Sequence, residues 1–443
     1  MIEKMQELKN LMRKFGIVGA GGAGFPSYAK LAEGADLLLV NGSECEPLLY
    51  TDYVILKNEL NIVLSGISKV LAHTGISKAL LCIKEHTAKR LGMEDGERRG
   101  DKIFIRVLPD VYPIGDEVSL IYEATGRLVN PGKLPITSGV IVYNVETMYN
   151  LGRAVRFSEP VMKKWLTVGG DIKNPTVIRV PIGTRIKDIF AALDIKVSEG
   201  YTVLDGGPSM GKIINPETYS VTKTTKGILI LPDDTQAIIS KKTNEKMAIA
   251  RAETACCQCT RCTDMCPRNM LGYPLEPHKM VRTAMGAAEV MPVMVLSATL
   301  CCGCGICESL ACSQGISPRA VIANYKGLLA KNKLRFNIPG EYSVRGEREY
   351  RMIPSKKWMS TLGVTKFDTV ADFSGEMEDF SRVEIPLSTH IGIPSNPVVL
   401  DGERVEVGAV IAQAAEGLSL PQHASISGTV TLGNGKITID RVR

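Results

Sequence analysis

The chain has 443 residues, 44% of them hydrophobic and 23% charged, which is typical of a globular protein and excludes disordered and fibrous classes. This length exceeds what one hydrophobic core usually serves, so several domains are expected. The net charge of +6 is small and the basic residues are scattered, which argues against nucleic-acid binding.

Residues 1–157 are predicted to form an α/β domain. Apolar residues at helical spacing predict an amphipathic helix over 1–15 that docks on its own domain, with no signal peptide. Further along, short apolar runs alternate with helical patterns, which indicates a largely parallel sheet. These runs lie at 36–41, 79–83, 103–108 and 139–143. Because no apolar stretch is long enough to span a bilayer, we expect a cytoplasmic protein without a transmembrane segment.

A glycine-rich loop, Gly19-Ala-Gly-Gly-Ala-Gly-Phe-Pro26, follows a short apolar run at 15–18 that reads as a strand. Its glycines permit the close backbone approach that a phosphate-bearing cofactor requires. The predicted strand at 36–41 then ends in Asn41-Gly-Ser-Glu44, which places polar groups at the carboxyl end of a strand, where such sites lie. Composition does not distinguish an NAD-binding Rossmann loop from a loop that binds another nucleotide.

Three further segments complete the expected organisation. Residues 158–243 read as a small α+β module of short strands with one helix near 186–193. Residues 331–380 are polar and are predicted to be a connecting arm. Residues 381–443 return to short strands and turns, which predicts a compact all-β unit.

Residues 244–330 are predicted to be helical, and they contain ten of the twelve cysteines. Such a cluster in a long chain favours metal ligation over disulfides. The first run, Cys256-x2-Cys-x2-Cys-x3-Cys266-Pro, has the bacterial ferredoxin spacing, and a second run extends from Cys301 to Cys312. In such pairs the fourth cysteine of each run completes the other cluster. We therefore expect two [4Fe–4S] clusters, one on Cys256, Cys259, Cys262 and Cys312 and one on Cys301, Cys304, Cys307 and Cys266.

Two alternatives remain open for these cysteines. CxxC pairs also bind zinc, although zinc needs no triple run. Cys257 and Cys302 fall out of register with the two runs, and either one is able to replace its neighbour as a ligand.

Four segments of the N-terminal domain resemble, in order, the FMN-site motifs of the flavin-carrying subunit of respiratory complex I. They are Gly19 to Lys30, Asn41 to Pro47, Tyr112-Pro-Ile-Gly-Asp-Glu117 and Tyr143-Asn-Val-Glu-Thr147. The resemblance implies FMN as cofactor, NADH as electron donor, and Glu44, Glu117 and Phe25 as catalytic residues, with Phe25 stacking on the nicotinamide or packing in the core. The implied cofactor-binding residues are Gly19, Gly21, Gly22, Gly24, Lys30, Asn41, Ser43, Glu44, Gly115, Asp116, Glu117, Asn144 and Thr147.

The paired cysteine runs resemble the RnfC component of the Rnf complex and, more closely, the cobalamin reductases of propanediol-utilising bacterial microcompartments. The segments 259–268 and 301–307 carry this likeness. Residues 165–232 resemble the β-grasp (SLBB) module of these proteins, and residues 384–443 resemble their barrel-sandwich hybrid domain. That domain is lipoyl-like, yet its hairpin at 416–420 has no lysine to modify. Its C-terminal position favours the microcompartment family over the Rnf component.

This resemblance implies a multidomain α/β oxidoreductase. Electrons from NADH would pass through FMN and two [4Fe–4S] clusters to cob(II)alamin, which would support a B12-dependent diol dehydratase inside a bacterial microcompartment. The implied partners are cobalamin or a cobalamin-processing enzyme, and a shell protein. One alternative is an Rnf-like NADH:ferredoxin oxidoreductase, and another is a non-enzymatic electron conduit between a shell protein and enzymes of the lumen.

Overall fold

A computed structural model describes residues 2–22, 24–286 and 291–441. The N-terminal α/β domain contains a five-stranded sheet in the order β3-β4-β2-β1-β6, in which only β3 is antiparallel to its neighbour. The predicted, largely parallel sheet is therefore confirmed. Its elements are α1 (Ile2–Lys14), β1 (Leu37–Asn41), α2 (Thr51–Thr74), β2 (Lys78–Lys84), α3 (Glu85–Leu91), β3 (Arg98–Gly100), β4 (Ile103–Leu108), β5 (Val111–Tyr112), α4 (Glu117–Thr125), β6 (Val140–Asn144) and α5 (Val145–Phe157).

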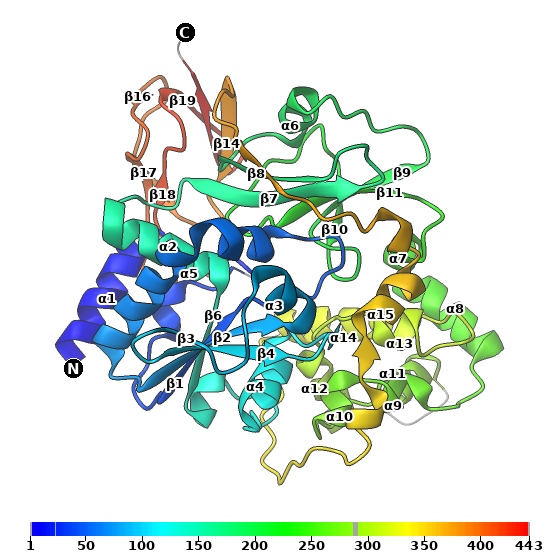
Figure 1. Cartoon of the computed structure of the whole chain (residues 1–443). Helices are drawn as coiled ribbons and strands as arrows, with labels where there is room; N and C mark the ends of the chain where they lie inside the picture. The colour runs from blue at the N-terminus through cyan, green and yellow to red at the C-terminus, as the bar shows by residue number, and fades with distance from the viewer. Residues whose placement is uncertain (1, 23, 287–290, 442–443) are drawn as a thin grey trace.

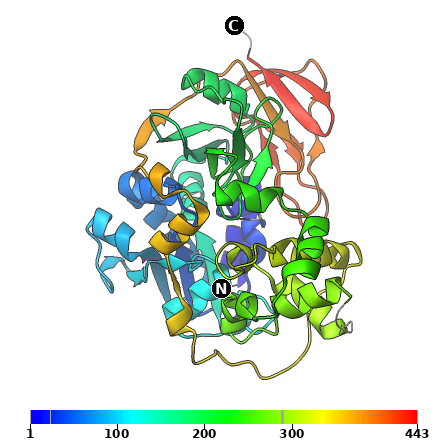
Figure 2. The same ribbon diagram turned by 90° about the vertical axis from the view of Figure 1, so that its right-hand side faces the viewer.

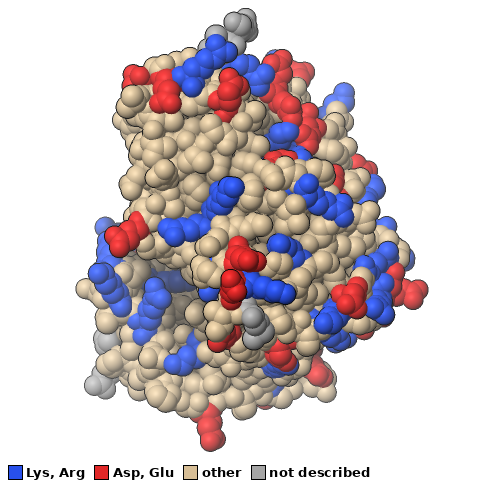
Figure 3. Space-filling view, turned by 90° about the vertical axis from the view of Figure 1, so that its left-hand side faces the viewer, with Lys and Arg blue, Asp and Glu red and all other residues tan. Residues whose placement is uncertain are grey.

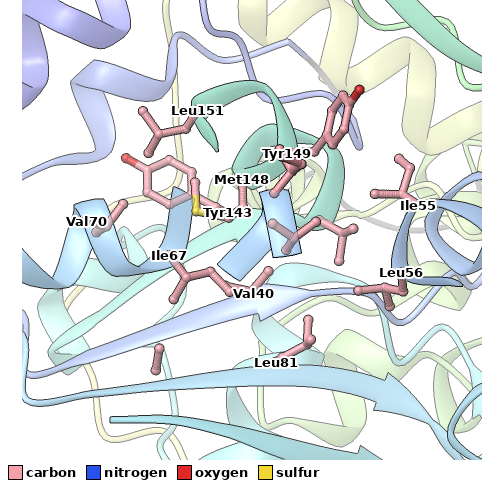
Figure 4. Packing of buried hydrophobic residues seen from close by; sticks show 14 of the residues in the cluster. Val40, Ile55, Leu56, Ile67, Val70, Leu81, Tyr143, Met148, Tyr149 and Leu151 are labelled. Carbon is pink, nitrogen blue, oxygen red and sulfur yellow. The ribbon is translucent and has the colours of Figure 1, made fainter. Parts of the chain in front are cut away.

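One face of this sheet forms the main core with α1, α2 and α5. Val40 and Leu81 from the strands pack with Ile67 of α2 and Met148 of α5 (Figure 4). The helix α1 buries its apolar stripe in the same core, which confirms that the predicted N-terminal helix docks on its own domain. Continuous apolar strands such as β1 are buried on both faces, as expected for a parallel sheet.

The strand predicted at 15–18 does not form. Only Val18 makes a bridge, and its partner is Pro26 at the other end of the glycine loop. The loop thus closes on itself directly after α1, and the first strand of the sheet is β1.

The second module is a mixed sheet in the order β10-β9-β11-β7-β8-β13, with α6 packed on it through Ile186, Ile189 and Phe190. The observed α6 agrees with the helix predicted near 186–193. The elements are β7 (Lys163–Gly170), β8 (Thr176–Pro181), α6 (Ile186–Ala192), β9 (Tyr201–Asp205), β10 (Lys212–Ile214), β11 (Gly227–Pro232) and α7 (Gln236–Lys242).

The cysteine-rich segment is helical, as predicted, and lies beside the N-terminal domain and below the small module (Figures 1 and 2). Most of its helices are short, because the cysteine-bearing turns interrupt them. They are α8 (Glu245–Ala255), α9 (Arg261–Asp264), α10 (Pro267–Met270), α11 (Pro277–Ala284), α12 (Pro292–Ser297), α13 (Ile306–Ser309) and α14 (Pro318–Lys331).

The predicted polar arm is more structured than its composition indicates. It contains β12 (Ile353–Pro354), which pairs with β5, then α15 (Ser355–Leu362), and β13 (Phe373–Glu376), which adds an edge strand to the small module. Trp358 of α15 is buried and stacks on Tyr112 with ring centroids 4.7 Å apart. A few widely spaced apolar anchors hold this segment, too sparse to give a periodic pattern.

The C-terminal residues form the predicted all-β unit, built from two small sheets around one core. Its strands are β14 (Arg382–Pro386), β15 (Asn396–Pro397), β16 (Arg404–Val405), β17 (Val410–Gln413), β18 (Gln422–His423), β19 (Gly428–Gly433) and β20 (Lys436–Asp440). Basic and acidic side chains are interspersed on the face shown in Figure 3. Among the described residues, no helix is both long and apolar enough to cross a bilayer.

Candidate functional site

All four flavin-like motifs meet at the carboxyl ends of β1 and β6. Asn41 ends β1 and Asn144 ends β6, and the two residues are partners in the parallel register. Asn144 Nδ2 donates to the Asn41 carbonyl at 3.1 Å, and Asn41 Nδ2 donates to the Gly115 carbonyl at 3.0 Å. Residues 103 and 74 positions apart are thus joined directly at the sheet edge where ligands of such folds bind.

The glycine loop lies on this edge. Gly19 N donates to the Phe25 carbonyl at 2.9 Å, and Ala20 N donates to Thr147 Oγ1 at 3.1 Å. A Cβ on Gly21 would come 2.8 Å from the side chain of Asn144, so only glycine allows this close approach. Gly22 is exposed and has open space where a Cβ would stand. The loop therefore presents accessible backbone beside the two asparagines, which suits a phosphate-bearing cofactor.

Lys30 and Glu117 form an ion pair beside this edge. Lys30 Nζ lies 2.7 Å from Glu117 Oε1 and also donates to the Val142 carbonyl at 3.1 Å. Both side chains remain partly exposed, at 29% and 39%. Phe25 is likewise partly exposed and belongs to none of the buried core clusters of the described residues. The ring of Phe25 is therefore accessible in part, as the stacking interaction with a nicotinamide would require.

Glu44 and Ser43 point away from solvent. Ser43 Oγ donates to the Cys82 carbonyl at 3.2 Å, beneath the sheet edge. Glu44 accepts from Thr51 Oγ1 at 2.9 Å and pairs with Lys226 Nζ at 3.2 Å. Burial raises the pKa of Glu44, and the charge of Lys226 acts against that shift.

The buried partners of Glu44 and Asn144 beneath the loop have no counterpart among the sequence predictions. Lys226 precedes β11 in the small module, and its Nζ lies 2.7 Å from Asp52 Oδ2 in α2. Asp52 Oδ2 also accepts from Asn144 Nδ2 at 3.1 Å, so this ion pair contacts a motif residue. A second buried pair joins Lys164 of β7 to Glu146 of α5. The partners of each pair come from different modules, so no local pattern identifies either pair.

Asp116, another residue of the third motif, is held by two partners within the protein. Its Oδ2 accepts from the Ser119 backbone at 3.3 Å and caps α4, while its Oδ1 lies 2.7 Å from the Arg268 guanidinium. Both carboxylate oxygens are therefore engaged, and one of them joins this motif to the cysteine-rich segment.

The cysteines line two separate cavities. The outer cavity contains Cys256, Cys259, Cys262 and Cys312, and the inner cavity contains Cys266, Cys301, Cys304 and Cys307. These are the same two sets that the crossed ferredoxin pattern predicts. Cys257 also lines the outer cavity and Cys302 the inner one, so both remain beside their respective sets.

The donor set of each cavity fits an iron–sulfur cluster. Burial, and then the neighbouring thiols of Cys312, Cys259 and Cys256, raise the pKa of Cys262 to about 12. Thiols gathered in this way are stabilised as thiolates by a bound metal group. Within the described ranges, no three His, Cys, Asp or Glu side chains converge closely enough to hold a single metal ion. The two sets are therefore defined by the cavities that they line.

Residues that line the inner cavity bond directly to the third flavin-like motif. Tyr112 Oη donates to the Cys304 carbonyl at 2.8 Å, and Arg268, the partner of Asp116, lines the cavity. The motif 112–117 thus contacts the sheet edge through Gly115 and the cysteine loop through Tyr112 and Asp116. The two candidate cofactor sites share one short segment of chain.

Three family models match successive parts of the chain. Residues 12–153 match the Nuo51 FMN-binding domain, residues 255–317 the 4Fe–4S dicluster domain, and residues 366–434 the RnfC barrel-sandwich hybrid domain. The first match decides between the nucleotides that composition left open, because it identifies an FMN-binding domain. The second match assigns the cysteine motifs to iron–sulfur chemistry.

Curated relatives cover most of the chain. Cobalamin reductase PduS of Salmonella typhimurium is 36% identical over 98% of this chain and 96% of its own length. PduS of Citrobacter freundii is 35% identical over 96% of this chain and 94% of its own. A component of the proton-translocating ferredoxin:NAD(+) oxidoreductase complex of Clostridium ljungdahlii is 32% identical over 60% of this chain and 57% of its own. The chain therefore belongs to the PduS cobalamin reductase family, as an electron-transfer oxidoreductase with an FMN-binding domain and a 4Fe–4S dicluster domain.

Proposed function

We propose that this protein transfers electrons from NADH to cob(II)alamin. The balanced reaction is NADH plus two cob(II)alamin giving NAD+, one proton and two cob(I)alamin. The activity of the PduS relatives, cobalamin reduction, supports the acceptor. The observation that carries the proposal is the direct bonding of motif 112–117 to both the sheet edge and the inner cysteine cavity.

A bound FMN accepts two electrons together as a hydride, and [4Fe–4S] clusters carry electrons singly, so the two groups convert between these modes. The protein's part is to position them. The backbone at Gly21 and Gly22 would hold the FMN phosphate, and Lys30 would offset its charge while bonded to Glu117. Phe25 would stack on the nicotinamide of NADH.

The roles of the predicted catalytic carboxylates differ. Glu117 lies at the exposed rim and is placed to contact the flavin or the nicotinamide. Glu44 is held by Thr51 and Lys226 in the buried network and would act by fixing the strand end that carries Asn41 and Ser43. We infer that Glu44 positions the site and that Glu117 contacts the bound groups.

The sequence likeness to microcompartment cobalamin reductases supports a place for the protein in that setting. There it would regenerate cob(I)alamin for a B12-dependent diol dehydratase, with a shell protein or a cobalamin-processing enzyme as partner. The Rnf-type relatives share only part of the chain, which favours cobalamin over ferredoxin as acceptor.

Anaerobic reconstitution tests the proposal. We expect about eight irons and one FMN per chain, bleaching of both absorbances on addition of NADH, and NADH-dependent reduction of cob(II)alamin. Reduction of ferredoxin but not of cob(II)alamin would overturn the acceptor assignment. Failure of NADH to bleach the flavin would overturn the donor assignment.

A pair of variants tests the cofactor sites. Cys262→Ala should lose about half of the iron and keep the flavin, because Cys262 lines only the outer cavity. Lys30→Ala should lose flavin and keep the iron, because Lys30 contacts only the N-terminal domain. If both variants retain both groups in full, the site assignments are wrong.

A further inference from the structure

A cleft of about 510 Å³ separates the small module from the cysteine-rich segment. It lies between β10 and α7 on one side and α14 on the other, in the region where Figure 2 shows the small module above the helices. Cys301 and Gly303 belong to its wall, and both also line the inner cysteine cavity. A molecule bound in this cleft would therefore touch the loop that carries the inner cysteines.

Four cations line the cleft, and they differ in their partners. Lys212 lies 3.4 Å from Asp205, and Arg319 pairs with Glu308. Lys241 instead donates to the carbonyls of Ser209 and Gly211, and Lys326 donates to that of Cys301. Across the part of the chain that the structure describes, neither of these two lysines has a carboxylate within ion-pair distance. The wall therefore carries excess positive charge.

The surroundings of Lys241 disfavour its charged form. Burial, and then the charge of Arg319, lower the pKa of Lys241 to about 8, with Glu46 and Glu308 acting in the opposite direction. An anion that entered the cleft would offset this repulsion between Lys241 and Arg319. Desolvated cations of this kind bind phosphate groups strongly.

The same cleft also exposes large apolar side chains. Met210 is 56% exposed and Ile213 is 44% exposed, and both belong to its lining. Apolar walls with a few convergent polar groups are typical of sites for small organic ligands. The lining thus suits a molecule that combines an anionic group with a large apolar surface.

We propose that this cleft binds the electron acceptor, with a phosphate group between Lys241, Lys326 and Arg319 and a ring system against Met210 and Ile213. The inference rests on the proposed function, because cob(II)alamin has one phosphodiester and a large corrin ring. A pyridine nucleotide also combines phosphate with rings, so the experiment compares cobalamin binding with NADH binding.

Equilibrium dialysis of cyanocobalamin against the reconstituted full-length protein tests the proposal. Lys326→Gln should raise the Kd about three- to tenfold, since one charge-assisted contact to phosphate is lost. Lys331→Gln, on an exposed lysine of the same helix outside the cleft, should leave the Kd unchanged. Dicyanocobinamide lacks the phosphodiester and should bind wild type and Lys326→Gln equally. Lys241→Gln is the second cleft variant and replaces Lys326→Gln as the test if the latter loses iron, because Lys241 belongs to the same proposed phosphate site.

The outcomes separate the two proposals. An unchanged cyanocobalamin Kd in both cleft variants would overturn the cleft assignment, while NADH-dependent cob(II)alamin reduction by wild type would leave the function standing. If the cleft variants bind NADH more weakly and bind cyanocobalamin as wild type does, the cleft assignment would also be overturned. A wild-type protein that neither binds cyanocobalamin nor reduces cob(II)alamin would overturn the proposed function itself.

Discussion

The FMN-binding domain contacts the rest of the chain on two sides, and the bonds on these sides differ. Beneath the glycine loop, Lys226 of the small module inserts between Asp52 and Glu44. The C-terminal domain also reaches this loop, where Ile391 N donates to the Gly24 carbonyl at 3.0 Å. On the other side, the Asp116–Arg268 ion pair and two hydrogen bonds hold the cysteine-rich segment, one from Tyr112 Oη to the Cys304 carbonyl and one from Tyr273 Oη to the Val129 carbonyl.

Because of this difference, separate sets of contacts position the two cofactors. The glycine-loop side depends on buried ions from modules far along the chain, so the flavin site is completed only when those modules dock. The cysteine side depends on these three polar contacts and on apolar packing, in which Leu271 and Leu300 join the core that α4 also enters. Damage to either side should therefore affect one cofactor more than the other.

Two lysines three residues apart show how sharply environments vary on the glycine-loop side. Burial alone would lower the pKa of Lys226, but the carboxylates of Asp52 and Glu44 outweigh it and raise that pKa. Lys223 is also buried, yet it donates only to the carbonyls of Gly16 and Pro421. Burial lowers the pKa of Lys223 to about 7.

The largest expected effect follows from Lys226→Met, which leaves two buried carboxylates without their cation. Removing one partner of a buried ion pair lowers the free energy of unfolding by about 3 to 5 kcal/mol. Flavin content should fall as well, because Asp52 also accepts a hydrogen bond from Asn144. Thermal unfolding and flavin quantification check this. Lys242→Met breaks a pair with Asp233 at the surface of the same module and should cost less than about 1 kcal/mol. Equal losses in the two variants would contradict the distinction.

Sequence reasoning finds the motif residues because each motif is a contiguous run with a recognisable order. Asn41, Gly115 and Asn144 do meet, since strand ends of a parallel sheet share one edge. Lys226 escapes such reasoning because a single lysine before an apolar strand reads as a solvated flank. Its role depends on the docking of two domains, which no local pattern encodes.

Asp116 and the arm both have partners that the sequence does not reveal, and for a related reason. Asp116 lies inside a flavin-like motif, so position alone assigns it to the cofactor, whereas its partner Arg268 belongs to another domain. The polarity of the arm predicts a simple connector, yet Trp358 and a short edge strand fix it to two modules. In both cases the partners lie far apart in the sequence, so a local pattern does not predict the contacts. The ferredoxin spacing does predict its site, because each set of three cysteines lies within one short segment.

The next largest effect should follow from Asp116→Asn, which keeps the cap of α4 but leaves Arg268 without a carboxylate. Both side chains are mostly buried, so we expect a loss of about 3 kcal/mol. Iron release to a chelator under anaerobic conditions should accelerate for about half of the iron, while flavin content stays near wild type. Asp101→Asn, in an exposed pair with Arg98, serves as control. Faster flavin loss with unchanged iron release would show that Asp116 serves the flavin after all.

A smaller effect concerns Lys223 and pH. The unfolded chain keeps this lysine protonated up to its ordinary pKa of 10.5, whereas the folded protein loses the proton near pH 7. The unfolded state thus binds more protons between these values, so stability rises with pH across this window. From pH 7 to 9 the gain from this group is about 2 kcal/mol.

The Tm of wild type relative to Lys223→Met should therefore rise between pH 7 and pH 9. The titratable groups facing Lys223 are His390 and His423, and burial lowers the pKa of each, that of His423 to about 3. Both are neutral throughout the window and contribute no slope there. A constant Tm difference between the two proteins would mean that Lys223 stays protonated when folded.

The smallest effect should follow from Tyr112→Phe, which removes the hydroxyl that bonds the Cys304 carbonyl and keeps the ring that stacks on Trp358. The cost should be about 1 kcal/mol. Tyr201→Phe, which loses an exposed bond to Asp171, is the control. In a Cys262→Ala background the outer cluster is removed, so any remaining iron–sulfur EPR signal comes from the cluster on the inner cysteines. A changed signal with Tyr112→Phe and an unchanged one with Tyr201→Phe would show that the flavin motif sets the inner cysteine loop. An identical signal with only a lower Tm would show that this hydrogen bond is a structural contact that does not set the environment of the inner cluster.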